Sequence, residues 1–123
     1  MEISDKKFRE IVGKAIDSIP APYANRLQNV AFIVEDRPSI EQAKRLQLAC
    51  NSLLFGLYEG VPLPQRNGAA KLLPDKITLF KKPLEFVSVS EADLAERIKH
   101  TVWHEVAHYY GLDHKRIHEL ENK

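Results

Sequence analysis

The residues best suited to chemistry lie close together near the C-terminal end of this 123-residue sequence. His104 is followed directly by Glu105, and His108 comes four positions after the first histidine. Side chains four positions apart project from the same side of a helix, so these two imidazoles can bind one metal ion. Gly111 and His114 complete the pattern H-E-x-x-H-x-x-G-x-x-H. The spacing therefore predicts a metal site with a carboxylate beside it.

The glycine and the third histidine of this pattern predict how the site is completed. Gly111 can adopt the left-handed conformation that ends a helix, and the chain can then bring His114 to a third coordination position. Imidazole ligands favour one Zn²⁺ per chain, although cobalt, nickel and iron also bind such sites. Three protein ligands leave one zinc position to water, as in catalytic sites. We expect Glu105 to take a proton from that water and pass it to a leaving group.

The helix that carries the motif predicts where the site lies relative to the core. On a helix that turns about 100° per residue, the apolar positions form one arc, which comprises Leu94, Ile98, Val102 and Val106. Glu105 lies inside this arc, and an unpaired buried carboxylate is unfavourable. Glu105 therefore needs a partner or a water-filled cleft. His104 and His108 lie at the edge of the arc, which predicts a metal site in a cleft beside the core.

Other polar residues are weaker candidates for a role in the site. His100 lies on the polar side of the same helix and is expected to be a solvated surface residue. His118 is expected at the surface, with support of a metal ligand or binding of a product as the alternatives. Asp113 either accepts a hydrogen bond from a ligand imidazole or caps a turn. Tyr58 is one candidate for stabilising an oxyanion.

Composition bounds the class of protein and its partners. The net charge of +1, from 18 basic and 17 acidic residues, provides no electrostatic case for binding nucleic acid or an anionic membrane. One cysteine excludes an internal disulfide framework. The N-terminal residues do not resemble a secretory signal. We expect a single domain, residues 1–123, that is cytoplasmic and acts on a peptide or protein. The oligomeric state stays open.

The remaining elements follow from hydrophobic periodicity and from helix caps. Ser4, Ser39 and Ser90 are candidate N-terminal caps. We expect helices at 5–18, 40–50 and 91–110, a short turn or helix from Pro83, a short tail helix at 115–120, and strands at 30–34, 53–58 and 76–80. This order favours an α+β domain with a small mixed sheet of three to four strands, a long active-site helix and flanking helices.

The motif resembles that of the zincin metallopeptidases. Its extended form is similar to the metzincin signature, but the methionine turn of that group is absent, because Met1 is the only methionine. Most of the chain resembles the small bacterial zincin-like metallopeptidases, through residues 57–63, 73–80 and 93–102 in addition to the motif. That family often has aspartate where this chain has His114. The resemblance implies a minimal zincin with a small sheet, an active-site helix and a cleft between them.

The resemblance implies a zinc metallopeptidase, a hydrolase that cleaves peptide bonds. Zincins bind an extended peptide along an edge strand beside the metal, and we expect residues 76–80 to form that edge. Two alternatives stay open. One is a metal-binding regulatory or interaction protein with little turnover. The other is a metal-dependent endoribonuclease, which shares the three-histidine spacing and the ending Gly111-Leu112-Asp113-His114 but lacks a glutamate at the position of Glu105.

Overall fold

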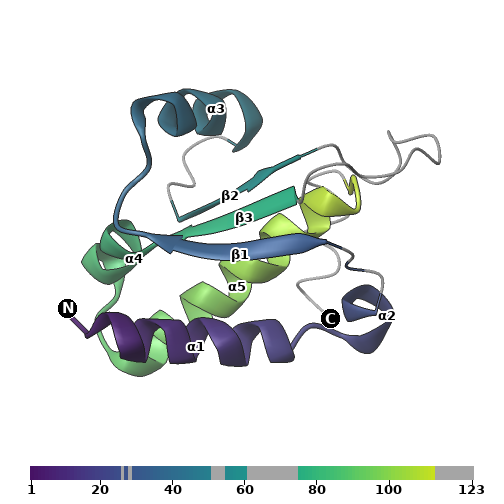
Figure 1. Ribbon diagram of the computed structural model, residues 1–123. Helices are drawn as coiled ribbons and strands as arrows, with labels where there is room; N and C mark the ends of the chain where they lie inside the picture. Colours follow the sequence, from purple (N-terminus) through teal and green to yellow (C-terminus); the bar gives the residue numbers. More distant parts are fainter. Residues whose placement is uncertain (26, 28, 51–54, 61–74, 113–123) are drawn as a thin grey trace.

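The computed structural model describes residues 1–25, 27, 29–50, 55–60 and 75–112. Within these residues a small sheet carries helices on both of its faces (Figure 1). In chain order the elements are α1 (Asp5–Asp17), α2 (Ala21–Ala24), β1 (Val30–Glu35), α3 (Ile40–Cys50), β2 (Gly56–Glu59), β3 (Asp75–Phe80), α4 (Lys81–Val87) and α5 (Glu91–Tyr109). The expected α+β class is confirmed.

The described strands form one mixed sheet in the order β1-β3-β2. β1 pairs with β3 in parallel, and β2 pairs with β3 in the antiparallel direction. β3 is therefore the central strand, and the expectation that residues 76–80 form the substrate-binding edge is wrong. Ile77, Thr78, Leu79 and Phe80 have no exposed surface. Such a continuous buried run is typical of a strand that is covered on both faces.

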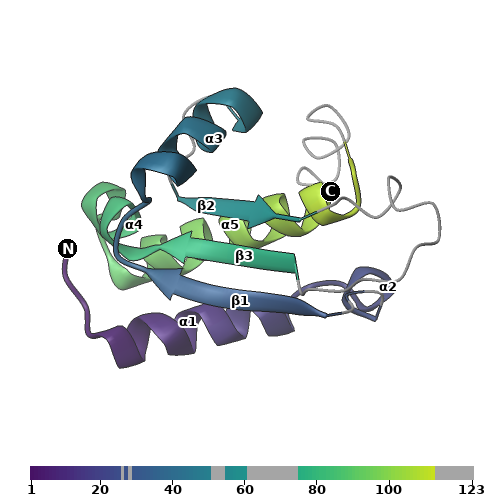
Figure 2. The ribbon, with the colours of Figure 1, turned by 45° about the horizontal axis from the view of Figure 1, so that its top comes forward.

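The two longest helices, α1 and α5, cover one face of the sheet (Figures 1 and 2). Between them and β3 lies the main core, to which α5 contributes the arc predicted from its periodicity: Leu94, Ile98, Val102 and Val106. α3 lies over the opposite face, where Leu57 and Phe80 form a smaller buried cluster. The helix that carries the metal motif is thus fixed along its length by apolar packing.

Serines begin the three long helices, as predicted. Ser4 and Ser90 each accept a hydrogen bond on Oγ from the backbone N–H three residues later. Ser39 and Gln42 exchange two hydrogen bonds, the reciprocal arrangement of a capping box. These bonds satisfy backbone donors that a helix leaves without partners in its first turn.

Two features differ from the expectations or lie outside the described residues. The short helix α2 was not expected: Pro20 is its N-cap, and Pro22 lies in its first turn, where the fixed φ of proline suits a helix. The short turn or helix expected from Pro83 is a helix, α4, which begins at Lys81. The expected tail helix at 115–120 lies outside the described residues. No helix within them is long and apolar enough to cross a membrane.

Candidate metal centre

The C-terminal half of α5 brings two histidine rings together. The Nε2 atoms of His104 and His108 lie 3.2 Å apart, and His104 is buried while His108 is half-buried. Two nitrogens that bind one tetrahedral zinc at about 2.0–2.1 Å lie about 3.3–3.4 Å apart. The spacing of the two rings therefore fits a shared zinc ion, and imidazole is a ligand type that zinc accepts readily.

Glu105 lies beside this pair and is nearly inaccessible to solvent. The residue is 4% exposed. Its Oε1 accepts a 2.8 Å hydrogen bond from the backbone N–H of Tyr58. One carboxylate oxygen of Glu105 and one ring nitrogen of each histidine all lie within 4.8 Å of one another. Burial raises the pKa of Glu105 to about 7, and the hydrogen bond from Tyr58 opposes that rise. The predicted buried carboxylate is confirmed.

The end of α5 has the form that the glycine predicted. Gly111 has a φ of 72°, in the left-handed region that glycine adopts without strain. Its N–H donates to the carbonyl of His108, and the N–H of Leu112 donates to the carbonyl of Ala107. This pair of bonds is the Schellman motif. The helix therefore stops within one turn of the second histidine, as a third ligand from the following residues requires.

The other candidates divide between exposed positions and positions outside the described residues. His114, the predicted third ligand, lies outside them, as do Asp113 and His118. His100 is exposed and is not part of the metal-capable group formed by the described residues, as expected for a surface residue. The described part of the centre thus consists of two imidazoles and one carboxylate, all from the same helix.

A comparison with protein families bears on this arrangement. The family model described as zincin-like metallopeptidase matches residues 27–123, which include every element from β1 to α5. The chain belongs to this family. No curated protein matches the chain. The membership confirms the resemblance drawn from the motif, and it implies a metal, typically zinc, at the His-Glu-His group.

In this zincin-like chain the side chain of Tyr58 contacts Asp75 and Tyr109. Its hydroxyl donates a 2.6 Å hydrogen bond to Oδ2 of Asp75, which is buried, with 5% exposure. Its ring meets the ring of Tyr109 edge to face, with centroids 6.1 Å apart. Because the Tyr58 hydroxyl donates its hydrogen bond to Asp75, the candidate role of Tyr58 in stabilising an oxyanion gains no support. Tyr58 reaches Glu105 through its backbone instead.

Gly56 is a residue of the site that the sequence reasoning missed. A Cβ atom at this position would lie 2.6 Å from Cγ2 of Thr101 and 3.3 Å from Cγ of Glu105. β2 therefore approaches α5 closely because residue 56 has no side chain. A glycine within a strand signals a bulge, an edge or a close backbone approach. Among the described strands β2 is an edge of the sheet, and Gly56 gives it a close approach to α5.

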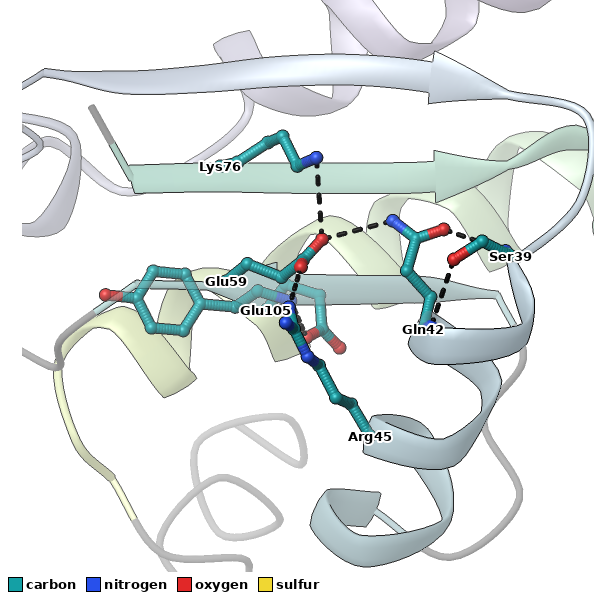
Figure 3. A network of polar contacts seen from close by, with 7 residues as sticks. Ser39, Gln42, Arg45, Glu59, Lys76 and Glu105 are labelled. Atoms are coloured by element: carbon teal, nitrogen blue, oxygen red, sulfur yellow. Dashed lines mark hydrogen bonds and ion pairs between the residues drawn. The ribbon is translucent and has the colours of Figure 1, made fainter. Parts of the chain in front are cut away.

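A polar network anchors β2 from the α3 face of the sheet (Figure 3). Glu59 accepts a 3.1 Å hydrogen bond from Nε2 of Gln42 and forms an ion pair with Arg45. Nζ of Lys76 lies 3.6 Å from the same carboxylate. These contacts tie α3, β2 and β3 together. The strand that contacts Glu105 is thus held from both sides, by α5 below and by this network above.

Proposed function

We propose that this zincin-like chain is a zinc-dependent peptidase in which His104, His108 and His114 hold one Zn²⁺ and Glu105 is the general base. One observation carries the proposal: the carboxylate of Glu105 is buried against the two ring nitrogens. The described residues place no cationic side chain against it. A carboxyl group whose pKa lies near neutrality can both take up and release a proton at physiological pH.

The residues divide the work of hydrolysis between binding and proton transfer. Bound zinc supplies a Lewis acid that polarises the peptide carbonyl and lowers the pKa of water. Glu105 accepts a proton from the attacking water as the new C–O bond forms. It then donates this proton to the amine nitrogen as the C–N bond breaks, so the proton balance closes. The Tyr58 N–H occupies one carboxylate oxygen, which leaves the other oxygen for this transfer.

The outer edge of β2 replaces residues 76–80 as the proposed docking strand for a peptide. β2 is an edge of the described sheet, and its Tyr58 N–H contacts Glu105, so the edge runs past the site. Because Glu105 already accepts a hydrogen bond from the Tyr58 N–H, an extended peptide would add to this edge through its other main-chain groups. Methylation of the peptide's backbone nitrogens should then weaken binding. The proposal includes a cytoplasmic location, and hence intracellular peptides or proteins as substrates.

The decisive experiment compares wild type with Glu105→Gln in a metal analysis and a peptide-library cleavage assay. Glu85→Gln is the matched control, because Glu85 is buried to the same extent, at 4% exposure, but lies on α4. We expect one zinc per chain in all three proteins, and cleavage by wild type and the control only. Loss of the general base should lower the rate by about 10²–10⁴-fold.

Two other outcomes of this experiment would contradict the proposal. One zinc per chain without cleavage of any peptide would favour a metal-binding regulatory protein. Cleavage of ribosomal RNA instead of peptides, by wild type and by Glu105→Gln equally, would favour the endoribonuclease. The same samples serve for both assays.

The third ligand has a test of its own, in which His114→Ala is compared with His118→Ala. If His114 binds zinc, its loss should weaken zinc affinity by more than about 100-fold, since even residues that only orient a ligand contribute 10–100-fold. His118→Ala should leave the affinity within about twofold of wild type if that residue is at the surface. Equal affinities for the two variants would remove His114 from the ligand set.

A further inference from the structure

We infer that β2 positions the general base: the N–H of Tyr58 holds the carboxylate of Glu105, and Gly56 is the positioning residue that lets the strand come close enough to do so. The inference rests on the proposed function for the role of the carboxylate. Its geometric part stands on the contacts between β2 and α5 alone. The hydrogen bond joins residues that are 47 positions apart in sequence.

The pairing of β2 explains why this N–H is available. The N–H of Phe80 donates to the carbonyl of Phe55, and Leu57 lies opposite Thr78. In an antiparallel pair the backbone groups of alternate residues face the partner strand. Residues 55, 57 and 59 therefore face β3, whereas the N–H of Tyr58 faces the outer edge. At that edge it donates to Glu105, in the place where water or another strand would otherwise accept.

The surroundings of Gly56 explain why the contact depends on glycine. The Cβ of any other residue would lie 2.6 Å from Cγ2 of Thr101, and Cγ of Glu105 and the carbonyl oxygen of Thr78 would each be 3.3 Å away. Thr101 cannot rotate to make room, because its Oγ1 donates a 2.7 Å hydrogen bond to the carbonyl of Arg97 and a β-branched side chain is stiff in a helix. A side chain at position 56 must therefore push β2 away from α5.

Displacement of β2 would act on the base and not on the metal ligands. The N–H of Tyr58 would move away from Oε1 of Glu105, and the carboxylate would lose the bond that fixes its orientation. His104 and His108 are carried by α5 itself, whereas Glu105 accepts the hydrogen bond from the Tyr58 N–H and has its Cγ beside Gly56. A base that is misplaced by about 1 Å loses on the order of 100-fold in rate. The expected defect is therefore in turnover, with zinc binding preserved.

The test uses four variants of the full chain. Gly56→Ala introduces the Cβ. Thr101→Ser removes only the Cγ2 atom that this Cβ would meet, and it keeps the hydroxyl that bonds to Arg97. The double variant combines the two changes. Gly13→Ala is the matched glycine control, because a Cβ at that position meets nothing within 4 Å.

The first readout is hydrogen exchange of the Tyr58 amide, followed by NMR in the zinc-loaded and metal-free proteins. We expect exchange to accelerate by at least about tenfold in Gly56→Ala, as for loss of a hydrogen bond to a charged group. Thr101→Ser and Gly13→Ala should match wild type, and the double variant should regain slow exchange. Unchanged protection in Gly56→Ala, or a loss that Thr101→Ser does not reverse, would overturn the inference.

The second readout is kinetic and separates positioning from general damage to the fold. In Gly56→Ala the kcat should fall on the order of 100-fold while KM and zinc affinity stay within about threefold of wild type, and the double variant should recover kcat. A fall in zinc affinity equal to the fall in kcat would contradict the inference. If wild type cleaves no peptide, the proposed function fails, but the amide readout still decides whether β2 positions Glu105.

Discussion

Two buried glutamates at opposite ends of the sheet have the same exposure and very different surroundings. Glu85 on α4 and Glu105 on α5 are each 4% exposed. Glu85 accepts a 2.8 Å hydrogen bond from the N–H of Ile3 and pairs with Lys82 at 3.5 Å. Glu105 accepts one backbone hydrogen bond, and the described residues bring no cation to it. Burial alone therefore does not separate the two carboxylates, but their partners do.

The other buried charge at the end of the sheet near α4, here called the α4 end, also has a partner, as Glu85 does. Lys81 is 5% exposed, and its Nζ lies 2.5 Å from the carboxylate of Asp5 on α1. The N-terminal ammonium of Met1 donates to the carbonyl of Glu85 at 3.0 Å. Each buried charge here has a partner from another element, so the charges join α4 to the N-terminal segment. At the metal end Glu105 has a backbone hydrogen bond, but no lysine or arginine of the described residues pairs with it, which is unfavourable for folding and fits the proton transfer proposed above.

The largest expected effect concerns zinc affinity, because the paired histidines should bind the metal and the α4 end should not. His104→Ala should weaken zinc affinity by more than about 100-fold, since a direct ligand contributes more than the 10–100-fold of a residue that orients one. His100→Ala, one turn earlier on the exposed side of α5, is the matched control and should bind zinc as wild type does. Competition with a chromogenic chelator measures both affinities. Similar affinities would show that the paired rings do not form the site.

The next effect is the pH dependence of the metal-free protein. The pKa of Glu105 rises from 4.5 to about 7 on folding, so folding favours the protonated form. The contribution of Glu105 to the free energy of unfolding is fully present below about pH 4.5, and it is lost as the pH rises through 7. Between pH 5 and 8 wild type should lose up to about 3 kcal/mol relative to Glu105→Gln. Urea unfolding in the presence of a chelator measures the difference.

Comparison of the two proteins isolates Glu105 in this experiment. Every other titratable group is common to the two proteins, so the difference between their stability profiles reports the carboxylate. Parallel stability profiles for wild type and Glu105→Gln would mean that the carboxylate is not desolvated in solution. The two glutamates would then differ less than their partners suggest.

Local patterns predicted α5 and its site because periodicity and spacing lie within one helix. The apolar arc, the paired histidines, the burial of Glu105 and the turn at Gly111 all depend on positions a few residues apart. The contact between Glu105 and Tyr58 was not predictable in this way, because every residue other than proline has a backbone N–H. The side-chain identity of Tyr58 therefore carries no signal of that bond, and instead it suggested a role for the hydroxyl.

Strand order was beyond local patterns for a related reason. Residues 76–80 were identified as a strand, but a strand's neighbours depend on how the chain crosses between them. The parallel pairing of β1 with β3 places β3 in the centre. In the structure the four consecutive buried residues of β3 agree with this central position, because an edge strand has fewer covered positions. The pairing of Asp5 with Lys81 was hidden likewise, since 76 positions separate the two.

A smaller effect is expected at the α4 end. Glu85→Ala removes the acceptor of the Ile3 N–H and the partner of Lys82, which should lower the free energy of unfolding by about 1–3 kcal/mol. Glu85→Gln keeps an acceptor oxygen and should lose about 1 kcal/mol or less. Zinc affinity should not change in either variant. Denaturant unfolding gives both stabilities, and a change in zinc affinity would show that the two ends are coupled.

The smallest effect has the opposite pH dependence to that of Glu105. Lys81 holds the pKa of Asp5 below its ordinary value of 3.8, through a hydrogen bond and its charge. The contribution of Asp5 to stability is therefore present above about pH 3.8 and is lost as the pH falls through the lowered pKa. Asp5→Asn should be less stable at pH 6 and should lack this acid-dependent loss, as measured by thermal unfolding between pH 2 and 6. Because Asp5 is mostly exposed, added salt should reduce the difference between the two proteins. An identical acid profile in Asp5→Asn would mean that the pair does not stabilise the α4 end, and the contrast with Glu105 would then rest on Glu85 alone.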